Sequence, residues 1–481
     1  MVFVPGGTYT LSADPFAGTT NPITLLLGEA TINTSATLVP PAGSRIIGTG
    51  YRSRVHMTAN PPLRGIQIGA SNIEVSGVRV TTVDTDGDPA AAGRGGIHVM
   101  SSGSRAWIHH NILDNVAQSG ITVEGTNTDV HDNLILNSRE HGIYVSNGSE
   151  NIVHDNIVLD AGQNSVLTAV QGIKCAACTK TNIHHNYVKN SFQNGISLEE
   201  SSPATSIEGT VVHSNTVYES GANGIRISGT VTGKASVLDN SVVMLDAVAE
   251  TAGIYAQTNT GGHDIKGNRV ITSNTATNGA CIRSTSTGVN FVTGNTCIAD
   301  AANVPWGILS ATGAGQIITN NWVLDGAGNF STGIRTTGTT GAVVLWNTVQ
   351  ATTRYSLASD TAIATHEQQT KLTSDVNLAG ELTIGAGGIS PDGAGFKHKR
   401  VSTGSIAAGE SAAVSVTWTT AFADTSYTVV GCAVEDSTAA TLALRLHHIE
   451  SKTAAGLVVR LVNDDRDAAH SGTLHCTAVH D

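Results

Sequence analysis

The sequence predicts an all-β chain whose main part is a right-handed parallel β-helix of about ten or more coils, followed by a small C-terminal β-sandwich module. Three observations predict this fold. A Gly-Ile-x-Val cassette recurs between residues 90 and 350, an Asn precedes a short apolar strand in each repeat, and successive Asn residues lie 22 to 30 positions apart. A period of this length and variation is typical of one coil of a solenoid. The alternative fold is a β-sandwich with accidental repeats.

The cassette explains how separate coils can share one core. In Gly-Ile-x-Val, Ile and Val point to one face and x to the other, because side chains alternate along a strand. Stacked coils then place Ile on Ile and Val on Val, which builds a core that no single coil could form. The clearest copies are Gly96–Val99, Gly120–Val123, Gly142–Val145, Gly172–Cys175, Gly195–Leu198 and Gly224–Ile227.

The recurring Asn predicts a ladder at one corner of the coil. Asn tolerates the left-handed backbone conformation, and its amide can bond the backbone and the Asn of the next coil. The ladder residues are Asn111, Asn133, Asn156, Asn186, Asn215, Asn240, Asn268, Asn295, Asn321 and Asn347. Histidines two positions earlier are expected to be turn surface on another face; they are His109, His131, His154, His184 and His213.

The repeat pattern divides the chain into four parts. Residues 1–90 are predicted to be the N-terminal entry of the β-helix, and residues 91–350 its regular coils with a substrate groove. The period stops after 350, so residues 351–394 are interpreted as a linker or intertwined segment. Residues 395–481 carry longer alternating strands and are predicted to form a trimerisation or carbohydrate-binding module.

The net charge and the distribution of apolar residues limit the classes of partner that the chain is expected to bind. The net charge of −12 makes nucleic acid an unfavourable partner. No apolar run approaches membrane-spanning length, so no membrane partner is expected, and no signal peptide is recognised. The chain opens in what looks like the middle of an element, which suggests N-terminal trimming.

The six cysteines give no firm redox assignment. Cys175 and Cys178 form Cys-x-x-Cys, but Cys175 takes the Val position of the cassette, which favours a core residue over a ligand. The two on later repeat strands are interpreted as buried thiols: Cys281 and Cys297. A bridge between Cys432 and Cys476 in the C-terminal module stays open.

Two segments resemble phage tailspike and tail-fibre proteins. The opening Val2-Phe3-Val4-Pro5-Gly6-Gly7-Thr8-Tyr9-Thr10-Leu11, followed by Asn-ladder coils, resembles the pectate-lyase-like β-helices of tailspike depolymerases. The ending Gly472-Thr473-Leu474-His475-Cys476-Thr477-Ala478-Val479-His480-Asp481 resembles the C-terminal β-module of phage fibres. The resemblance implies a homotrimer, a virion-tail or extracellular location, and a groove that binds or cuts a bacterial surface polysaccharide. The N-terminal virion-anchoring domain of an intact tailspike is missing, which leaves a free-standing polysaccharide lyase open.

The outward x positions of stacked cassettes predict the site. They form a ladder of ionisable, aromatic and polar groups in a chain that is only 13% charged: His98, Thr122, Tyr144, Lys174, Ser197, Arg226 and Tyr255. Residues before the cassette Gly are expected at the same edge: Ser119, His141, Gln171, Asn194 and Asn223. Longer gaps around Lys174 predict inserted loops at 160–170 and 200–209, and such loops commonly build a binding face.

The first predicted chemistry is β-elimination in a polysaccharide that contains uronic acid. This reaction needs a base, a cation to neutralise the carboxylate, and an acid for the leaving oxygen. Lys174 or His141 is the candidate base, Tyr144 the acid, and Arg226 with His98 the neutralising groups. The candidate substrate-binding residues are His98, Gln171, Asn194, Glu199, Asn223 and Tyr255.

Two other functions stay open at this point. A tailspike glycoside hydrolase would use two carboxylates from Glu124, Glu140, Glu199 and Glu200. A non-catalytic phage receptor-binding adhesin would only bind the glycan. No metal ligands are assigned, although Glu199 and Glu200 are of the residue type that binds calcium.

Overall fold

The computed structural model describes residues 1–59, 64–83, 95–162, 170–199, 206–228, 233–245, 252–257, 262–277, 279–358, 362–364, 377–378, 383–384, 387–388, 396–418, 427–436, 444–463, 465 and 468–480. The chain divides into two compact units, Met1–Asn377 and Leu378–Asp481. Among the described residues, no helix is long and apolar enough to cross a membrane.

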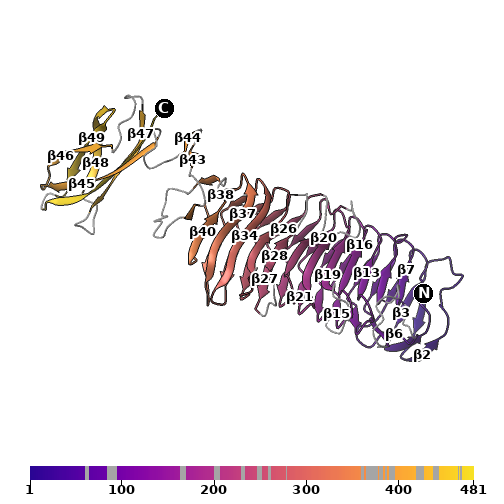
Figure 1. Cartoon of the computed structure of the whole chain (residues 1–481). Helices are drawn as coiled ribbons and strands as arrows, with labels where there is room; N and C mark the ends of the chain where they lie inside the picture. The colour runs from indigo at the N-terminus through magenta and orange to yellow at the C-terminus, as the bar shows by residue number, and fades with distance from the viewer. Residues whose placement is uncertain are drawn as a thin grey trace. The chain divides into compact units, whose positions relative to one another are not determined.

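The first unit is a parallel β-helix built from three sheets, which confirms the predicted fold (Figure 1). Each regular coil gives one short strand to each sheet, and the next coil repeats the pattern. Sheet A has 15 strands: β1 (Val2–Val4), β3 (Thr24–Leu27), β5 (Arg45–Ile47), β8 (Glu74–Ser76), β11 (Trp107–His109), β14 (Asp129–His131), β17 (Ile152–His154), β20 (Asn182–His184), β23 (Val211–His213), β26 (Ser236–Leu238), β29 (Asp264–Lys266), β32 (Phe291–Thr293), β35 (Ile317–Thr319), β38 (Val343–Leu345) and β41 (Ala362–Ala364).

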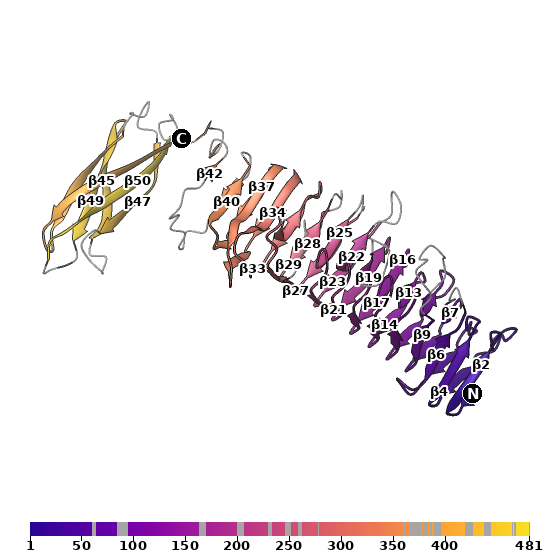
Figure 2. The same ribbon diagram turned by 60° about the horizontal axis from the view of Figure 1, so that its bottom comes forward.

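Sheets B and C complete the coils. Sheet B has 14 strands: β2 (Gly7–Leu11), β4 (Ala30–Thr34), β6 (Arg54–Met57), β9 (Arg79–Thr82), β12 (Ile112–Asp114), β15 (Leu134–Leu136), β18 (Ile157–Leu159), β21 (Tyr187–Lys189), β24 (Thr216–Tyr218), β27 (Ser241–Met244), β30 (Arg269–Thr272), β33 (Thr296–Ala299), β36 (Trp322–Asp325) and β39 (Thr348–Val349). Sheet C has 13 strands: β7 (Ile66–Ile68), β10 (Ile97–Val99), β13 (Ile121–Val123), β16 (Ile143–Ser146), β19 (Gln171–Ala176), β22 (Asn194–Glu199), β25 (Ile225–Ser228), β28 (Ala252–Ala256), β31 (Ala280–Ser284), β34 (Val304–Ala314), β37 (Phe330–Thr340), β40 (Thr353–Leu357) and β42 (Asn377–Leu378). Figure 2 shows the strands of sheet C following one another in chain order.

The parallel ladders extend beyond the segment in which the cassette is regular. At the start, β1 and β2 already pair in parallel with β3 and β4. At the end, β40 pairs with β37 and β41 pairs with β38. Coils therefore continue past residue 350, into the segment for which the sequence predicts a linker.

The cassette residues form the core as the alternation predicts. Ile97 pairs with Ile121 and Val99 with Val123, and all four side chains are fully buried. The preceding glycine has a packing reason as well. A Cβ added at Gly224 would collide with the Cγ1 atom of Val242, so only glycine lets sheets B and C approach this closely.

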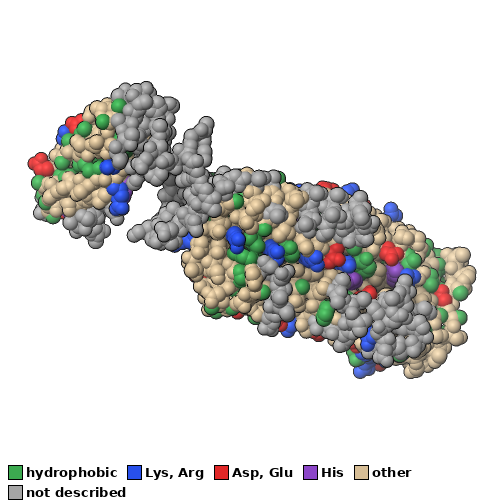
Figure 3. Space-filling view, in the orientation of Figure 1, with side chains coloured by type: hydrophobic (Ala, Val, Ile, Leu, Met, Phe, Trp, Pro, Cys, Tyr) green, Lys and Arg blue, Asp and Glu red, His purple; other side chains and the backbone are tan. Residues whose placement is uncertain are grey.

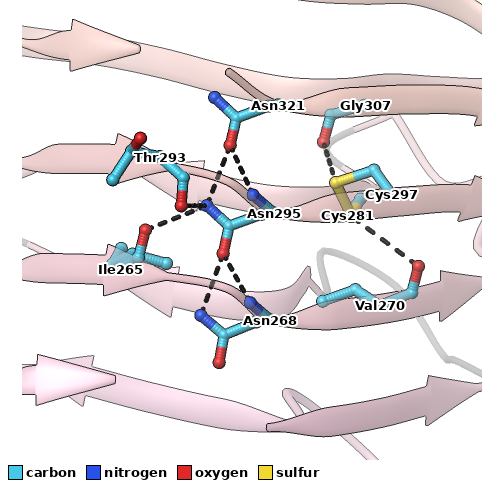
Figure 4. Close-up of a disulfide and its surroundings, with 9 residues drawn as sticks. All are labelled: Ile265, Asn268, Val270, Cys281, Thr293, Asn295, Cys297, Gly307 and Asn321. Carbon is cyan, nitrogen blue, oxygen red and sulfur yellow. Dashed lines mark hydrogen bonds between the residues drawn. A yellow bond between two sulfur atoms is a disulfide. The ribbon is translucent and has the colours of Figure 1, made fainter. Parts of the chain in front are cut away.

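The Asn ladder is present, but the corner differs from the prediction in one respect. Asn295 Nδ2 donates to Asn321 Oδ1 at 2.9 Å and to the Ile265 carbonyl at 2.9 Å, and Asn268 Nδ2 donates to Asn295 Oδ1 at 2.9 Å (Figure 4). The left-handed residue is the one before each Asn, because the Asn itself must face inward to make these bonds. These preceding residues have φ of 52° to 68°: His110, Asp132, Asp155, His185, Ser214, Asp239, Gly267, Gly294, Asn320 and Trp346.

The cysteines are paired in the structure. The prediction of free thiols at Cys281 and Cys297 is wrong, because both point into the coil from neighbouring sheets, with Cα atoms 5.8 Å apart, and form a disulfide (Figure 4). Cys175 and its partner Cys178 are also disulfide-bonded and fully buried, as core positions should be. In the second unit Cys432 of β47 (Tyr427–Asp436) faces Cys476 of β50 (His470–His480), and the two are bridged.

The second unit contains two antiparallel three-stranded sheets. One has the order β45 (Phe396–Ile406), β50 (His470–His480), β47 (Tyr427–Asp436), and the other β46 (Ser411–Thr417), β49 (Gly456–Asn463), β48 (Leu444–Thr453). A short hairpin precedes them, β43 (Thr383–Ile384) with β44 (Gly387–Gly388). Val459 and Leu461 from one sheet and Leu474 from the other share one buried core, which makes the module a small sandwich.

Candidate functional site

The outer face of sheet C carries the ladder that the sequence predicts. His98 pairs in register with Thr122, Thr122 with Tyr144, and Tyr144 with Lys174. The ladder continues through Ser197, Arg226 and Tyr255. Figure 3 shows basic, acidic and histidine side chains gathered in a line along this face. Stacking at one coil spacing, about 4.8 Å, brings each of these groups within reach of its neighbours.

A central cluster forms around Lys174. Its Nζ lies 3.0 Å from Glu199 Oε2 and 5.6 Å from the ring centroid of Tyr144. The side chains of Lys174 and Glu199 are 16% and 15% exposed, so the ion pair is largely enclosed. The other oxygen of Glu199, Oε1, accepts hydrogen bonds from Ser197 Oγ at 2.7 Å and Gln171 Nε2 at 3.1 Å. Three donors therefore contact the Glu199 carboxylate.

His141 joins this cluster as a neutral imidazole. Its ring lies 5.0 Å from that of Tyr144, and its Nδ1 accepts the backbone N–H of Gln171 at 3.1 Å. Burial, reinforced by the nearby Lys174 charge, holds the pKa of His141 well below its usual range. The remaining ring nitrogen, Nε2, then carries the proton. His141 is therefore arranged as a hydrogen-bond donor, which does not suit the role of base.

Glu140, next to His141, lies in a different environment from Glu199. Burial raises the pKa of Glu140, while a hydrogen bond from Ser119 Oγ at 3.4 Å and the Lys174 charge act to lower it. The net direction is upward, so Glu140 keeps its proton to a higher pH than an ordinary glutamate. Lys174 thus forms an ion pair with Glu199, and its charge also acts on the carboxyl group of Glu140.

Two buried amides border the cluster. Asn223 Nδ2 donates to Asn194 Oδ1 at 3.0 Å, and Asn223 Oδ1 accepts the backbone N–H of Ala252 at 2.9 Å. Asn194 Nδ2 and Gln171 Oε1 are buried and have no hydrogen-bond partner among the described residues. Such groups are costly to leave unpaired, which favours a polar ligand or water beside them.

Three predicted residues lie on the same face but outside the central cluster. His98 is three coils from Lys174; its Nε2 is 3.3 Å from Glu124 Oε1, and its pKa is lowered to about 4, mainly by burial and also by the Arg64 charge. Arg226 donates from Nη2 to Gln257 Oε1 at 2.7 Å. Tyr255, further along, lies under a guanidinium group. These residues extend the row of polar and aromatic side chains along the face.

The same row continues beyond the residues that the sequence analysis singled out. The Arg283 guanidinium lies 4.8 Å from the Tyr255 ring centroid, and the Arg335 guanidinium 5.3 Å from that of Trp306. Arg283 pairs in register with Tyr255, and Arg335 follows Gly333-Ile334, a weaker copy of the cassette, so the x position of the repeat was the available signal. Together with Lys174 and Tyr144, these residues give the face three pairs of a cation with an aromatic ring.

Other predictions at this face are only partly covered by the structure. Most of both inserted loops, residues 163–169 and 200–205, lies outside the described residues, and so does Glu200. Glu199, one of the two residues considered for calcium from the sequence, pairs with Lys174. The histidines predicted as turn surface lie on sheet A, another face, but they end strands and are half-buried: His109, His131, His154, His184 and His213.

Comparisons with known proteins agree with this architecture. The family of right-handed beta helix regions matches residues 64–212. A search of curated protein sequences finds no match. Among solved structures, a variant tailspike protein of E. coli bacteriophage HK620 in complex with a hexasaccharide is 14% identical, with a TM-score of 0.53, over 99% of this chain and 86% of that chain.

Two further tailspikes are similar over most of their length. The Dettilon tailspike protein is 15% identical, with a TM-score of 0.47, over 95% of this chain and 88% of that one. The Pseudomonas phage phi297 tailspike is 11% identical, with a TM-score of 0.45, over 95% and 90%. The matched region and the HK620 structure together lead to one conclusion: the chain contains a right-handed β-helix region and shares the fold of a phage tailspike protein.

Proposed function

We propose that the chain binds and depolymerises a bacterial surface polysaccharide on the outer face of sheet C, by hydrolysis between Glu140 and Glu199. The observation that carries the proposal is the difference between these two carboxyl groups. Burial raises the pKa of Glu140, whereas Glu199 is ion-paired with the ammonium group of Lys174 and accepts hydrogen bonds from two further donors. A glycosidase needs one protonated and one ionised carboxyl group, set apart by their environments.

An inverting mechanism needs a wider separation of the two carboxyl groups than a retaining one. Glu140 precedes β16 and Glu199 ends β22, so two coil spacings, about 9.6 Å, are the smallest separation of their backbone positions, and the two side chains must lean toward each other across the face. Inverting glycosidases place their carboxyl groups roughly 6.5–9.5 Å apart. Glu140 would donate its proton to the glycosidic oxygen as the C–O bond breaks. Glu199 would take a proton from the water whose oxygen bonds to the anomeric carbon.

The ligand class follows from the length and character of the face. An open row of polar, aromatic and cationic side chains spanning many coils suits an extended polymer better than a small molecule. The HK620 tailspike variant, with the same fold, is in complex with a hexasaccharide. Gln171 Oε1 and Asn194 Nδ2, which have no partner among the described residues, supply an acceptor and a donor for sugar hydroxyls.

β-Elimination is the second candidate, and the row of cations favours it. Lys174, Arg226, Arg283 and Arg335 stand along one face of an acidic protein, where they would neutralise uronate carboxylates. In this mechanism, neither of the predicted bases is free to take a proton. The Nδ1 lone pair of His141 is occupied by a backbone N–H and Lys174 is ion-paired, so Tyr144 is left as the proton-transfer group.

A polysaccharide panel separates the candidates. The chain is incubated with alginate, pectate, hyaluronan, xanthan, gellan and bacterial surface polysaccharides, while ultraviolet absorbance and reducing ends are followed. New reducing ends with a flat absorbance trace support hydrolysis. Rising absorbance reports an unsaturated uronate, which overturns hydrolysis in favour of elimination. Binding without new ends across the panel supports the adhesin.

Matched variants test where the site lies. Lys174→Ala and Tyr144→Phe should each reduce turnover strongly. Lys189 on sheet B lies 5.2 Å from the Tyr218 ring centroid, the same kind of pair on a different face. Lys189→Ala and Tyr218→Phe should therefore leave turnover unchanged. Equal effects at both pairs would show that the site on sheet C is misplaced.

The pH dependence tests Glu140 as the acid. Because Glu140 must hold its proton to act, turnover should fall as pH rises through its raised pKa. Ser119→Ala removes a hydrogen bond that favours the ionised form, so the alkaline limb should move to higher pH with the plateau rate retained. Ser220→Ala, at another buried serine, should leave the limb in place. A limb that does not move in Ser119→Ala would remove Glu140 from this role.

The resemblance to tailspikes also supports a proposal for the oligomeric state of the chain and for where it acts. We propose a homotrimer that acts at the virion tail or outside the cell, where a bacterial surface polysaccharide is accessible. The C-terminal sandwich of β45–β50 is the candidate trimerisation or carbohydrate-binding module.

A further inference from the structure

A column of stacked imidazoles runs along the outer face of sheet A, away from the sheet C site. His109 pairs in register with His131, and His131 with His154. Their ring centroids are 4.8 Å and 4.9 Å apart, with nearly parallel planes. His184 and His213 extend the column with the same geometry. The repeat thus places donor nitrogens at every coil spacing.

A second column lies beside the first, at the left-handed corner residues. His110 and Asp132 occupy this position in neighbouring coils, with φ of 56° and 54°. His109 Nδ1 is 2.8 Å from His110 Nδ1, and His131 Nδ1 is 2.8 Å from Asp132 Oδ2. The positive φ is held by the ladder Asn that follows each residue, so the backbone fixes where these side chains start.

We propose that His110, His131 and Asp132 bind a divalent transition-metal ion of the zinc class. One ligand atom from each residue lies within 4.8 Å of the others. His131 Nδ1 and His110 Nε2 are 2.8 Å and 4.0 Å from Asp132 Oδ2. Two ligands of a tetrahedral zinc ion at about 2.0–2.1 Å lie roughly 3.3–3.4 Å apart, so these separations bracket the required value.

The donor set and its exposure fit this ion class. Two imidazoles with one carboxylate suit zinc and its neighbours in the first transition series, whereas calcium and magnesium prefer all-oxygen sites. The side chains of His110 and Asp132 are 64% and 46% exposed, which lets an ion enter and water complete the coordination. His109 stacks on His131 and contacts His110, and so orients both imidazole ligands.

The chain contains its own comparison site. His184 Nδ1 lies 2.8 Å from His185 Nδ1, and the His185 and His213 ring centroids are 5.9 Å apart, against 6.1 Å for His110 and His131. The corner residue of the next coil is Ser214 there, where the proposed site has Asp132. The second cluster therefore has matching imidazoles without the carboxylate, and it should bind the ion more weakly.

Isothermal titration of the tag-free chain with Zn²⁺ tests the proposal, with Co²⁺ absorption as an independent report of coordination. We expect one stronger site, and we expect Asp132→Asn or His110→Asn to weaken Zn²⁺ binding roughly tenfold or more. Asn retains the tolerance for positive φ, so both variants should keep the wild-type circular dichroism spectrum and melting temperature. His185→Asn should leave the stronger site unchanged.

The control is Asp155→Asn, one coil further along at the same corner position. Asp155 contacts His154, with Nδ1 to Oδ2 at 2.7 Å, but it lies outside the proposed ligand set. Its replacement should leave the stronger site intact. Absence of Zn²⁺ binding at micromolar to low millimolar concentration would overturn the proposal, and so would an equal loss in Asp155→Asn and Asp132→Asn.

Discussion

Glu199→Gln should lower the rate of polysaccharide hydrolysis by about 100- to 10,000-fold, the range expected for loss of a general base. The amide cannot take a proton from water, and it leaves the Lys174 ammonium, 3.0 Å away, without its counter-charge. Glu140→Gln should cause a comparable loss by removing the proton donor. Reducing-end assays on the substrate found in the panel would measure both effects.

Binding and fold need to be separated from chemistry in this experiment. Both variants should still bind oligosaccharide, because the proposed loss lies in proton transfer. Glu150→Gln is the matched control: Glu150 pairs with Lys180 at 3.4 Å, and both side chains are largely exposed. Its turnover should be that of the wild type. If Glu199→Gln retains full activity while Tyr144→Phe loses it, elimination replaces hydrolysis as the mechanism.

Asn215→Ala should lower the free energy of unfolding of the β-helix by at least about 3 kcal/mol, because several buried polar groups lose partners at once. Asn186 donates to Asn215 Oδ1 through both its backbone N–H and Nδ2, at 3.0 Å each. Asn215 Nδ2 in turn donates to Asn240 Oδ1 at 3.0 Å and to the Ile183 carbonyl at 2.9 Å. Urea unfolding would measure the loss through a lower transition midpoint.

The end of the same ladder supplies the comparison. Asn347 accepts from Asn321 and donates to the Ile318 carbonyl, but it is half-buried, and the described part of the chain shows no further Asn after it in the ladder. Asn347→Ala should therefore cost less than Asn215→Ala, because water can reach the groups that lose their partners. Equal losses at the two positions, or a loss under about 1 kcal/mol at Asn215, would contradict this account of the ladder.

The fold was predictable because the cassette and the recurring Asn are each explained by a single structural arrangement. Ile and Val spaced by one residue after a glycine can be buried only if coils stack, and the spacing of the Asn residues sets the coil. The same logic predicted that Tyr144, Lys174 and Arg226 share one face, because strands in register align their outward positions. Sequence spacing alone therefore specified the ladder.

Features that depend on contacts between sheets were not predictable in the same way. The Cys281–Cys297 bridge joins two sheets, and the sequence pattern does not give the distance between them. Nor does the pattern say that Lys174 bends toward Glu199 on the next coil. His141 seemed a candidate base by residue type, but its burial and backbone bond follow from the coil packing.

The Asn ladder also gives the molecule a direction. From Asn111 to Asn347 each amide donates to the residue one coil further along, so the carbonyl ends all face the N-terminal coils. Bonds aligned head to tail polarise one another, so each rung is strengthened by those on either side. The first oxygen is capped by the backbone N–H of Val78 at 3.1 Å. A whole coil could be duplicated or deleted within the row without reversing any bond, which makes the length of the outer face of sheet C adjustable in steps of one coil.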